Sequence, residues 1–267
     1  MSIGIDIGGT HTRIGIGNSG SVEKKDDFPT GEFSKTIEEI KKAVKRFSPQ
    51  QNTKVGVACP GPIETKTGKL GNLNNLPSFS GKNLKEVLER ELSLSVTVEH
   101  DASLAALAEA RYGAGKGKDP VLYYTVSTGI GTGLIYHGEV YRGVFNPEAG
   151  QQIVTGVNRN LEKVASGTAL KEIYGKDPAK IVGTPEWDKA LERLARGITN
   201  SILHYSPEIV IIGGGLTTNQ EAFFEPLVGK IRDFLTTFPL PAIIHPALGE
   251  NSTLIGAIEL ADTGSDP

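Results

Sequence analysis

The sequence lacks most of what a disulfide-bonded, membrane-bound or nucleic-acid-binding protein requires. Its 267 residues include a single cysteine, Cys59, so no internal disulfide can form, and such a chain suits a reducing cytoplasm. No apolar run approaches the length that spans a bilayer, and no charged and apolar leader precedes the first strand-like run. The net charge of −3 provides no basic face for nucleic acid or a membrane surface. We therefore expect a cytoplasmic globular protein whose partners include neither nucleic acid nor membrane.

Aromatic residues are also few, at 6%, whereas glycine is abundant, with 33 residues. Hydrophobic residues make up 38% and charged residues 22% of the chain, which is ordinary for a globular protein. The length is about twice that of a common domain, so two domains are expected, each with its own core. Many glycines follow apolar runs in tight clusters, and these clusters are the candidate functional segments.

Apolar periodicity predicts alternating strands and helices with mixed sheets, an α/β architecture. Strands are expected at residues 3–7, 13–17, 21–26, 55–58, 96–99, 121–126, 134–137, 139–142, 210–212 and 242–245. Helices are expected at residues 37–47, 83–92, 102–112, 162–174, 187–204, 222–235 and 252–261. Residues 262–267 are interpreted as a frayed tail.

Both halves repeat one plan, in which a strand, a glycine-rich turn and a second strand are surrounded by helices. Gly, Lys and Pro break the pattern between Gly113 and Pro120, where we place the boundary between two lobes. The predicted N-terminal lobe is residues 1–115, and the predicted C-terminal lobe is residues 116–249. The helix in residues 250–262 is expected to pack back on the N-terminal lobe.

The turn after the first strand, Asp6–Thr10, has the features of an anion-binding loop. Gly8 and Gly9 allow backbone N–H groups to approach phosphate oxygens closely. The Asp6 carboxylate is a candidate ligand for Mg2+, through water, because Mg2+ releases its own waters reluctantly. A simple hairpin turn is the alternative, since the spacing matches neither the P-loop nor the dinucleotide-binding fingerprint.

Two further glycine clusters follow strands in the second half. Ser127–Gly133 alternates glycine with hydroxyl side chains, and together with the first loop it indicates a phosphate held between two lobes. Gly213–Gly215 follows an apolar strand, where bare backbone would let adenine or ribose pack against the next helix. Ordinary glycine-rich turns are the alternative for each cluster taken alone.

A carboxylate lies between these loops, in the segment Glu99–Ala102. Asp101 follows a predicted strand and precedes a predicted helix, so it can be an N-cap that satisfies free helix amides. It can also face the cleft and accept a proton from a sugar hydroxyl, although the spacing alone favours the cap. The two roles are compatible, and the residues themselves leave both open.

Segments in chain order resemble motifs of the ROK family, whose members are repressors, uncharacterised reading frames and sugar kinases. They are Asp6–Thr10, Pro60–Pro62, Asn75–Pro77 with Ser80 and Gly81, Glu99–Ala102, Gly113–Gly117, Ser127–Gly133, Pro147–Gly150 and Ile211–Gly215. Each motif is weak alone, but the ordered set covers essentially the whole chain.

The resemblance implies a two-lobed actin-like ATPase fold of the ribonuclease H-like type, and an ATP-dependent sugar kinase with Asp101 as general base. The sugar-binding residues that it implies are Ser80, Gly81, His100, Asp101, Glu148, Gln151 and Glu162. The ATP-binding residues that it implies are Asp6, Gly8, Gly9, Thr10, His11, Thr128, Gly129, Gly131, Thr132, Gly213, Gly214 and Gly215, with Mg2+ at Asp6. For Glu148 and Glu162, ordinary surface charges are the alternative.

The chain departs from the family pattern at His100, where Asn is usual, at Gln151, where His is usual, and at His11, where Lys is common. The zinc-binding cysteine run of many members is absent, and residues 151–162 contain neither Cys nor His. A structural zinc needs four such ligands, so we expect a short member of the family without zinc. The changes at His100 and Gln151 keep hydrogen-bonding capacity, which retains a polyol substrate and leaves the identity of the hexose open.

The predicted reaction is in-line transfer of a phosphoryl group from ATP–Mg2+ to the 6-hydroxyl of a hexose, most simply glucose. Alternatives within the family are an N-acetylhexosamine kinase, a fructokinase, and polyphosphate as the donor. A sugar-responsive repressor and a catalytically inert sugar-sensing regulator are alternatives of another class. The acidic charge argues against the repressor, and the presence of Asp6 and Asp101 argues against the inert regulator. A homodimer is left open.

Overall fold

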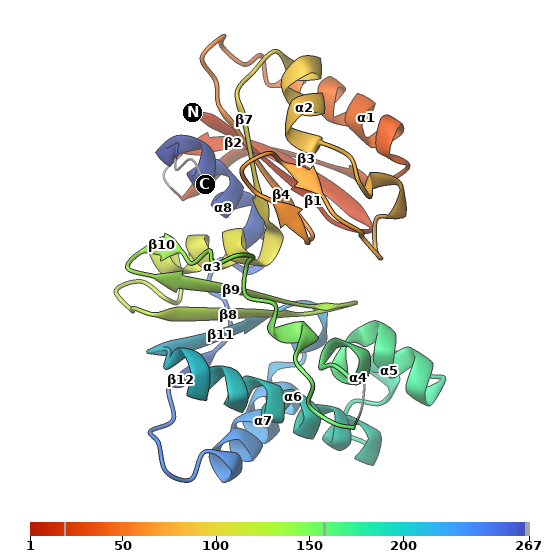
Figure 1. Cartoon of the computed structure of the whole chain (residues 1–267), viewed down its shortest axis with the longest axis vertical. Coiled ribbons are helices and arrows are strands. Elements are labelled where there is room, and N and C mark those ends of the chain that lie inside the picture. Colours follow the sequence, from red (N-terminus) through yellow and green to blue (C-terminus); the bar gives the residue numbers. More distant parts are fainter. Residues whose placement is uncertain (19, 157–158, 265–267) are drawn as a thin grey trace.

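The computed structural model describes residues 1–18, 20–156 and 159–264. It has two lobes, each built on a five-stranded mixed sheet with helices against it (Figure 1). The N-terminal lobe is at the top of Figure 1 and the C-terminal lobe is below it. None of the described helices is both long and apolar enough to cross a membrane.

The N-terminal sheet has the strand order β3-β2-β1-β4-β7. Its strands are β1 (Ser2–Ile7), β2 (His11–Asn18), β3 (Ser21–Pro29), β4 (Val55–Cys59) and β7 (Val96–His100). The first three strands pair antiparallel, and β4 and β7 run parallel to β1. Every residue of β1 and β4 is buried, which requires cover on both faces of the sheet. Helices α1 (Phe33–Arg46) and α2 (Leu84–Leu92) cover the outer face.

The C-terminal sheet repeats this order and these directions as β10-β9-β8-β11-β12. Its strands are β8 (Val121–Val126), β9 (Ile130–Tyr136), β10 (Glu139–Val140), β11 (Ile209–Gly213) and β12 (Ala242–Ile244). Its helices are α4 (Glu162–Ala165), α5 (Gly167–Tyr174), α6 (Pro185–Tyr205) and α7 (Gln220–Phe234). Their apolar side chains form one core with the sheet, in which the ring centroids of Trp187 and Phe223 lie 6.2 Å apart.

Two helices, α3 (Asp101–Tyr112) and α8 (Ser252–Thr263), lie between the sheets and share a separate apolar cluster. Close approach depends on glycine, because a Cβ at Gly56 would lie 1.9 Å from the carbonyl oxygen of Ala257 in α8. The last helix therefore lies against β1 and β4 of the N-terminal sheet, although it follows the C-terminal sheet in the chain. The limits of the lobes at residues 115 and 249 stay predictions.

The connections between the lobes meet at a buried carboxylate, that of Glu109 in α3. It accepts hydrogen bonds from the backbone N–H groups of Ala114, Ala247 and Leu248, and from the hydroxyl of Ser252. Ala114 lies on the connection from α3 to β8, Ala247 and Leu248 lie on the connection from β12 to α8, and Ser252 is the first residue of α8. The buried side chain of Glu109 is thus bonded to both connections between the lobes.

The structure corrects several predicted elements. The expected helix 162–174 is two helices, because Ser166 ends α4 and its hydroxyl caps α5 by accepting from Ala169 N–H. The strand expected at 134–137 begins at Ile130, so residues 130–133 are strand and not loop. A short hairpin, β5 (Ile63–Glu64) and β6 (Lys69–Leu70), was not predicted. The 3-10 turns are Pro77–Phe79, Ala149–Gln151, Pro178–Lys180, Gly215–Thr217 and Gly249–Asn251.

The predicted frayed tail begins too early. Asp262 and Thr263 are the last residues of α8, and Asp262 accepts a hydrogen bond from Ser2 in β1. Residues 265–267 lie outside the described part of the chain.

Candidate active site

The carboxyl ends of the parallel strands face one another across the space between the two lobes. In such sheets the crevice beyond the strand ends is the usual ligand site. A cavity of about 530 Å³ lies there. It is lined by Gly8, Gly9, Pro60, Gly61, Pro62, Asn72, Leu73, Asn74, Asn75, His100, Asp101, Thr125, Ser127, Thr128, Gly129, Ile130, Gly131, Glu148, Gln151 and Glu162. We call it the interlobe cavity.

The interlobe cavity brings together many of the residues singled out in the sequence. They are Gly8, Gly9, His100, Asp101, Thr128, Gly129, Gly131, Glu148, Gln151 and Glu162. They come from loops far apart in the chain, so the predicted phosphate loops and the predicted carboxylates share one space. Which of them contacts which ligand stays a prediction.

Asp101 is the first residue of α3, directly after β7. The N-cap position belongs to His100, whose side chain makes no capping hydrogen bond. One oxygen of Asp101, Oδ1, accepts from the next backbone N–H, that of Ala102, at 2.6 Å. The side chain is 29% exposed, so its carboxylate is accessible from the cavity. Asp101 can therefore support the helix start and still accept a proton.

Two polar side chains, those of His100 and Glu148, converge beside Asp101. His100 Nε2 lies 3.4 Å from Asp101 Oδ1 and 3.8 Å from Glu148 Oε1. Burial raises the pKa of Glu148; His100 opposes the rise, while the charges of Asp101 and Glu162 add to it. A desolvated carboxylate gains more from a hydroxyl donor than one in water does, which suits it to bind a polyol.

Two further predicted sugar residues are held by hydrogen bonds to neighbouring segments. Glu162, at the start of α4, accepts from Ile130 N–H through Oε2 at 2.9 Å, which ties it to the glycine-rich turn. Gln151 accepts from the side-chain amide of Asn160 at 2.7 Å. Each side chain thus has one oxygen already bonded.

A second cavity, of about 670 Å³, adjoins the first. Its lining consists of Ser127, Thr128, Gly167, Thr168, Lys171, Asp177, Pro178, Ala179, Val182, Trp187, Gly215, Leu216, Thr218 and Asn219. Ser127 and Thr128 line both cavities, and the first amides of α5, at Gly167 and Thr168, hold their carbonyl oxygens. A ligand with a bulky end and an extended anionic chain can therefore lie across this shared loop.

Some predicted site residues lie elsewhere. The hydroxyl of Thr132 is fully buried; it donates to Pro147 O and accepts from Ala149 N–H, and Thr132 lines neither cavity, so its contact with ATP stays a prediction. The Ser80 hydroxyl accepts from Leu73 N–H. This bond ties Ser80 to Leu73, which does line the cavity, and the contact of Ser80 with sugar stays a prediction.

Other predicted residues border the cavities without lining them. Gly81, Thr10 and His11 are exposed and line neither cavity. Of the glycine triplet only Gly215 lines the second cavity. A Cβ at Gly214, where φ is +100°, would lie 2.5 Å from Val126 O, so this glycine serves a turn packed against β8.

The structure also adds residues that sequence reasoning missed. Asn72, Asn74 and Asn75 line the interlobe cavity, and Lys171 and Asp177 line the second one. The asparagine-rich stretch was visible in the sequence, but sugar contact was assigned to Ser80 instead. No local pattern marks Lys171 or Asp177, because they are single charges on ordinary surface-like segments.

Comparison with known proteins identifies the family of this chain. The family model described as "ROK family" matches residues 2–263. The chain belongs to the ROK family. A curated glucokinase of Thermotoga maritima is 29% identical over 304 aligned positions, which cover 97% of this chain and 96% of that enzyme.

Solved ROK structures share the fold along the whole chain. The ROK hexokinase of Thermus thermophilus has a TM-score of 0.86 at 27% identity, with 98% of each chain covered. The ROK glucokinase of Streptomyces griseus, solved with glucose and AMPPNP, has a TM-score of 0.85 at 25% identity, covering 98% of this chain and 99% of that one. The expected two-lobed actin-like fold is confirmed, and the chain is a phosphotransferase of the ROK sugar-kinase type.

A second carboxylate, that of Asp6 at the end of β1, lies close to this ROK site. Burial and the charges of Asp101 and Asp27 raise its pKa to about 7 from its ordinary 3.8, against the opposing charge of Arg13. Arg13 Nη1 lies 3.7 Å from Asp6 Oδ2, and Arg13 Nε lies 3.3 Å from Asp27 Oδ2. A buried carboxylate among other acids is a group that a cation stabilises, so Asp6 fits the Mg2+ that the resemblance implies.

We expect Asp6→Asn to stabilise the ligand-free protein at pH 8 while it lowers kinase activity. The folded pKa of Asp6 is raised, so its contribution to stability is present below about pH 4 and is lost as the pH rises through about 7. One unit of pKa corresponds to about 1.4 kcal/mol, so a gain of at least about 1 kcal/mol is expected at pH 8, shrinking towards pH 4.5. Urea unfolding at both pH values measures it, with Asp233→Asn, at an exposed position of α7, as control. A loss of stability at pH 8 would show that the charge of Asp6 is not disfavoured.

Zinc is not expected in this ROK protein. Within the described ranges, no three His, Cys, Asp or Glu side chains gather as a metal-binding group. Part of the segment that replaces the cysteine run, residues 157–158, lies outside those ranges. We predict that activity survives a strong zinc chelator once Mg2+ is restored, and elemental analysis that finds one tightly bound zinc per chain would contradict this.

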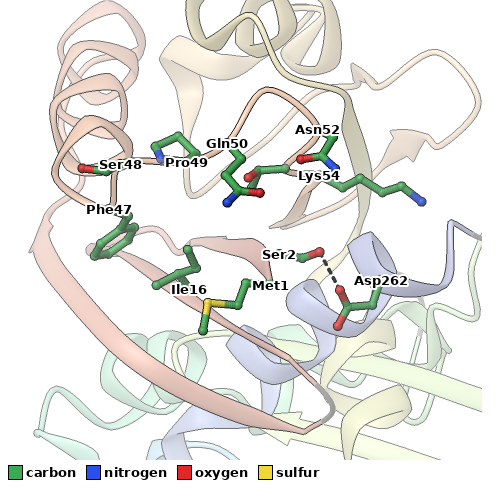
Figure 2. Close-up of a pocket in the computed structure, with 11 residues that line it drawn as sticks. Met1, Ser2, Ile16, Phe47, Ser48, Pro49, Gln50, Asn52, Lys54 and Asp262 are labelled. Carbon is green, nitrogen blue, oxygen red and sulfur yellow. Dashed lines mark hydrogen bonds between the residues drawn. The ribbon is translucent and has the colours of Figure 1, made fainter.

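A further cavity, of about 440 Å³, lies on the N-terminal lobe away from the ROK site (Figure 2). Its acid, Asp262, is already bonded to Ser2, as the dashed line in Figure 2 shows. The side chain of Lys54 extends away from that pair. The cavity lacks the converging carboxylates of the interlobe cavity, so we do not place the reaction there.

Proposed function

We propose that this protein transfers the γ-phosphoryl group of ATP to a hydroxyl of a hexose, most simply the 6-hydroxyl of glucose. The interlobe cavity carries the proposal, because in it Asp101 lies beside the carboxylate of Glu148. This cavity also adjoins the second cavity at Ser127 and Thr128. One space offers a base and polyol acceptors, and the other has the size for a nucleoside.

The donor is proposed to be ATP because the two cavities share Ser127 and Thr128 in their linings. Adenosine would lie in the second cavity beside Gly215 and Leu216, with its phosphates over the bare backbone of Gly129. The Streptomyces griseus relative solved with an ATP analogue supports this assignment. Asp6 would hold Mg2+, which neutralises phosphate charge when it is bound.

The acceptor is proposed to be a hexose because the remaining lining is suited to hydroxyl groups. Glu148 offers carboxylate oxygens, and Asn72 and Asn75 offer amides that both donate and accept. Such a site rejects analogues that leave its buried acceptors unpaired. Glucose is preferred because the glucokinases compared above align along nearly their whole length, whereas His100 and Gln151 keep fructose and N-acetylhexosamines as alternatives.

The residues of this chain divide the work of the transfer. Asp101 accepts the proton of the attacking hydroxyl, and His100, within 3.4 Å of it, orients that carboxylate. The sugar-binding side chains hold the hydroxyl in line with the phosphoryl group, because such transfers depend mainly on positioning and charge stabilisation. Closure of the lobes would exclude water, which competes as a phosphoryl acceptor.

A coupled assay tests the proposal with glucose, mannose, fructose, N-acetylglucosamine and N-acetylmannosamine as acceptors. Each is tried with ATP and with polyphosphate, and binding of each sugar is measured by calorimetry in parallel. We expect glucose with ATP to give the highest kcat/KM. Sugar binding without turnover would favour a sugar-sensing regulator, and the absence of both from folded protein would sink the proposal.

A further inference from the structure

A buried carboxylate next to the proposed site has no part in the chemistry described so far. Glu99 is the residue before His100 and is fully buried, with a side chain 1% exposed. It does not line the interlobe cavity. A buried carboxylate is costly unless it is well bonded, so its partners indicate what it is for.

The partners of Glu99 come mainly from the other lobe. Its Oε2 accepts from Arg142 Nε at 2.6 Å, and its Oε1 accepts from Asn146 Nδ2 at 2.7 Å. Oε1 also accepts from the backbone N–H of His100 at 2.8 Å, and Asn146 Nδ2 donates further to Ser103 Oγ at 2.9 Å. Arg142 and Asn146 follow β10 of the C-terminal sheet, whereas Glu99 ends β7 of the N-terminal sheet.

The segment that Glu99 holds, residues 141–148, ends at Glu148. Its middle has little apolar packing, because Val144 is fully exposed and Phe145 is 70% exposed. Polar bonds to Glu99 rather than a hydrophobic core therefore keep this segment against β7 and α3. Bonds that involve a charged group are the stronger kind, which suits them to this task.

A second anchor acts on the other side of Glu148. The buried hydroxyl of Thr132 in β9 donates to Pro147 O at 2.6 Å and accepts from Ala149 N–H at 3.0 Å. The residues on either side of Glu148 are thus bonded to β9, while Asn146 is bonded to Glu99. Glu148 itself is left with its carboxylate directed to His100, at 3.8 Å.

We propose that Glu99 is a positioning residue, which through Asn146 and Arg142 holds Glu148 in register with His100 and Asp101 for sugar binding. The carboxylate of Glu99 accepts from His100 N–H, so it fixes the backbone directly before Asp101, the proposed base. It also accepts from Asn146, so it fixes the segment that contains Glu148, the proposed sugar acceptor. This inference rests on the proposed function, since it assigns sugar contact to Glu148.

The test removes the Asn146 amide, which is half-buried and carries no charge, so that folding is retained. In Asn146→Ala we expect the sugar KM to rise about tenfold, the value of one hydrogen bond to a charged group, with the ATP KM within about twofold of wild type. Amide hydrogen exchange should become faster in residues 141–148 and stay unchanged in α6. Glu99→Gln, which keeps an acceptor but loses the ion pair with Arg142, should change both readouts in the same direction. Asn18→Ala, at an exposed strand end, is the control and should change neither.

The sugar KM and the amide hydrogen exchange together distinguish a failure of the proposed function from a failure of the inference about Glu99. If wild type phosphorylates no hexose, the proposed function fails, and faster exchange confined to residues 141–148 in Asn146→Ala still supports the anchoring by Glu99. Unchanged exchange in that segment overturns the inference whether or not the wild type is active. Faster exchange with an unchanged sugar KM in an active enzyme also overturns it, because the segment would then not position Glu148. Equal rises in the KM for sugar and for ATP would indicate a global defect and count against it as well.

Discussion

Asp101→Asn is expected to lower kcat for hexose phosphorylation by about a hundred- to ten-thousandfold, the usual loss when a general base is removed. The amide has the shape of the carboxylate but cannot accept the hydroxyl proton. Sugar affinity and thermal stability are expected to stay close to those of wild type. The reason is that the Asn oxygen can accept the same hydrogen bond from Ala102 N–H that Asp101 Oδ1 accepts at 2.6 Å.

This substitution separates the two roles that Asp101 can have. If the carboxylate only supports the start of α3, Asn replaces it without loss, and kcat stays near that of wild type. Single-turnover kinetics with saturating ATP measure the chemical step, and sugar titration calorimetry measures affinity. Asp233→Asn, at an exposed position of α7, is the matched control. Near-normal turnover in Asp101→Asn would leave the protein without its proposed base.

Glu148→Gln is expected to raise the sugar KM by about ten- to a hundredfold and to leave the ATP KM nearly unchanged. Loss of a charged acceptor for a buried hydroxyl costs about 1.5–3 kcal/mol, whereas a surface substitution costs within about 0.5 kcal/mol. Steady-state kinetics with each substrate varied in turn measure both constants. Glu162→Gln provides the contrast: Glu162 also accepts from Ile130 N–H, at the start of β9 directly after Gly129, so both KM values of the variant should rise.

The pH dependence gives an independent check on Glu148. Burial raises its pKa, so protonation should weaken sugar binding at a higher pH than it would for an exposed glutamate. In wild type the sugar KM is expected to rise as the pH falls through the raised pKa of Glu148. Glu148→Gln should lose that dependence. A Gln variant whose sugar KM keeps the wild-type pH profile would place the titrating group elsewhere.

Much of the fold could be predicted because local residue patterns indicate most of its strands and helices. Apolar runs that end in glycine turns mark β1, β8 and β11, and the amphipathic spacing of residues 187–204 marks α6 to within two residues at its start. These signals depend only on neighbouring side chains, so they survive without knowledge of the rest of the chain. The break at Ser166 was missed because a serine within a helical pattern is ambiguous until its hydroxyl is seen to cap α5.

The glycine-rich segment Ser127–Gly133 shows where local patterns mislead. Alternating glycines suggested a loop around phosphate, yet Ile130–Gly133 is the start of β9. A Cβ at Gly133 would lie 2.4 Å from Ala102 O, so this glycine serves the close approach of α3. Thr132 faces inward from the same strand, and its hydroxyl is used by Pro147 and Ala149. A tight turn and a tight helix contact select glycine for the same steric reason, and the sequence does not distinguish them.

The sequence by itself determined the positions of most strands and helices in outline, the family motifs and the chemical types at the site, because each depends on residues close together in the chain. Only the tertiary structure decided which groups meet. In the fold, Glu99 bonds to a segment more than forty residues away along the chain. Ser80 and Thr132 hold neighbouring backbone in place. Asn72 and Lys171 lie in the cavity walls. The physical reason is that a buried polar group must find a partner wherever the fold provides one, and that partner is a property of packing in space rather than of local pattern.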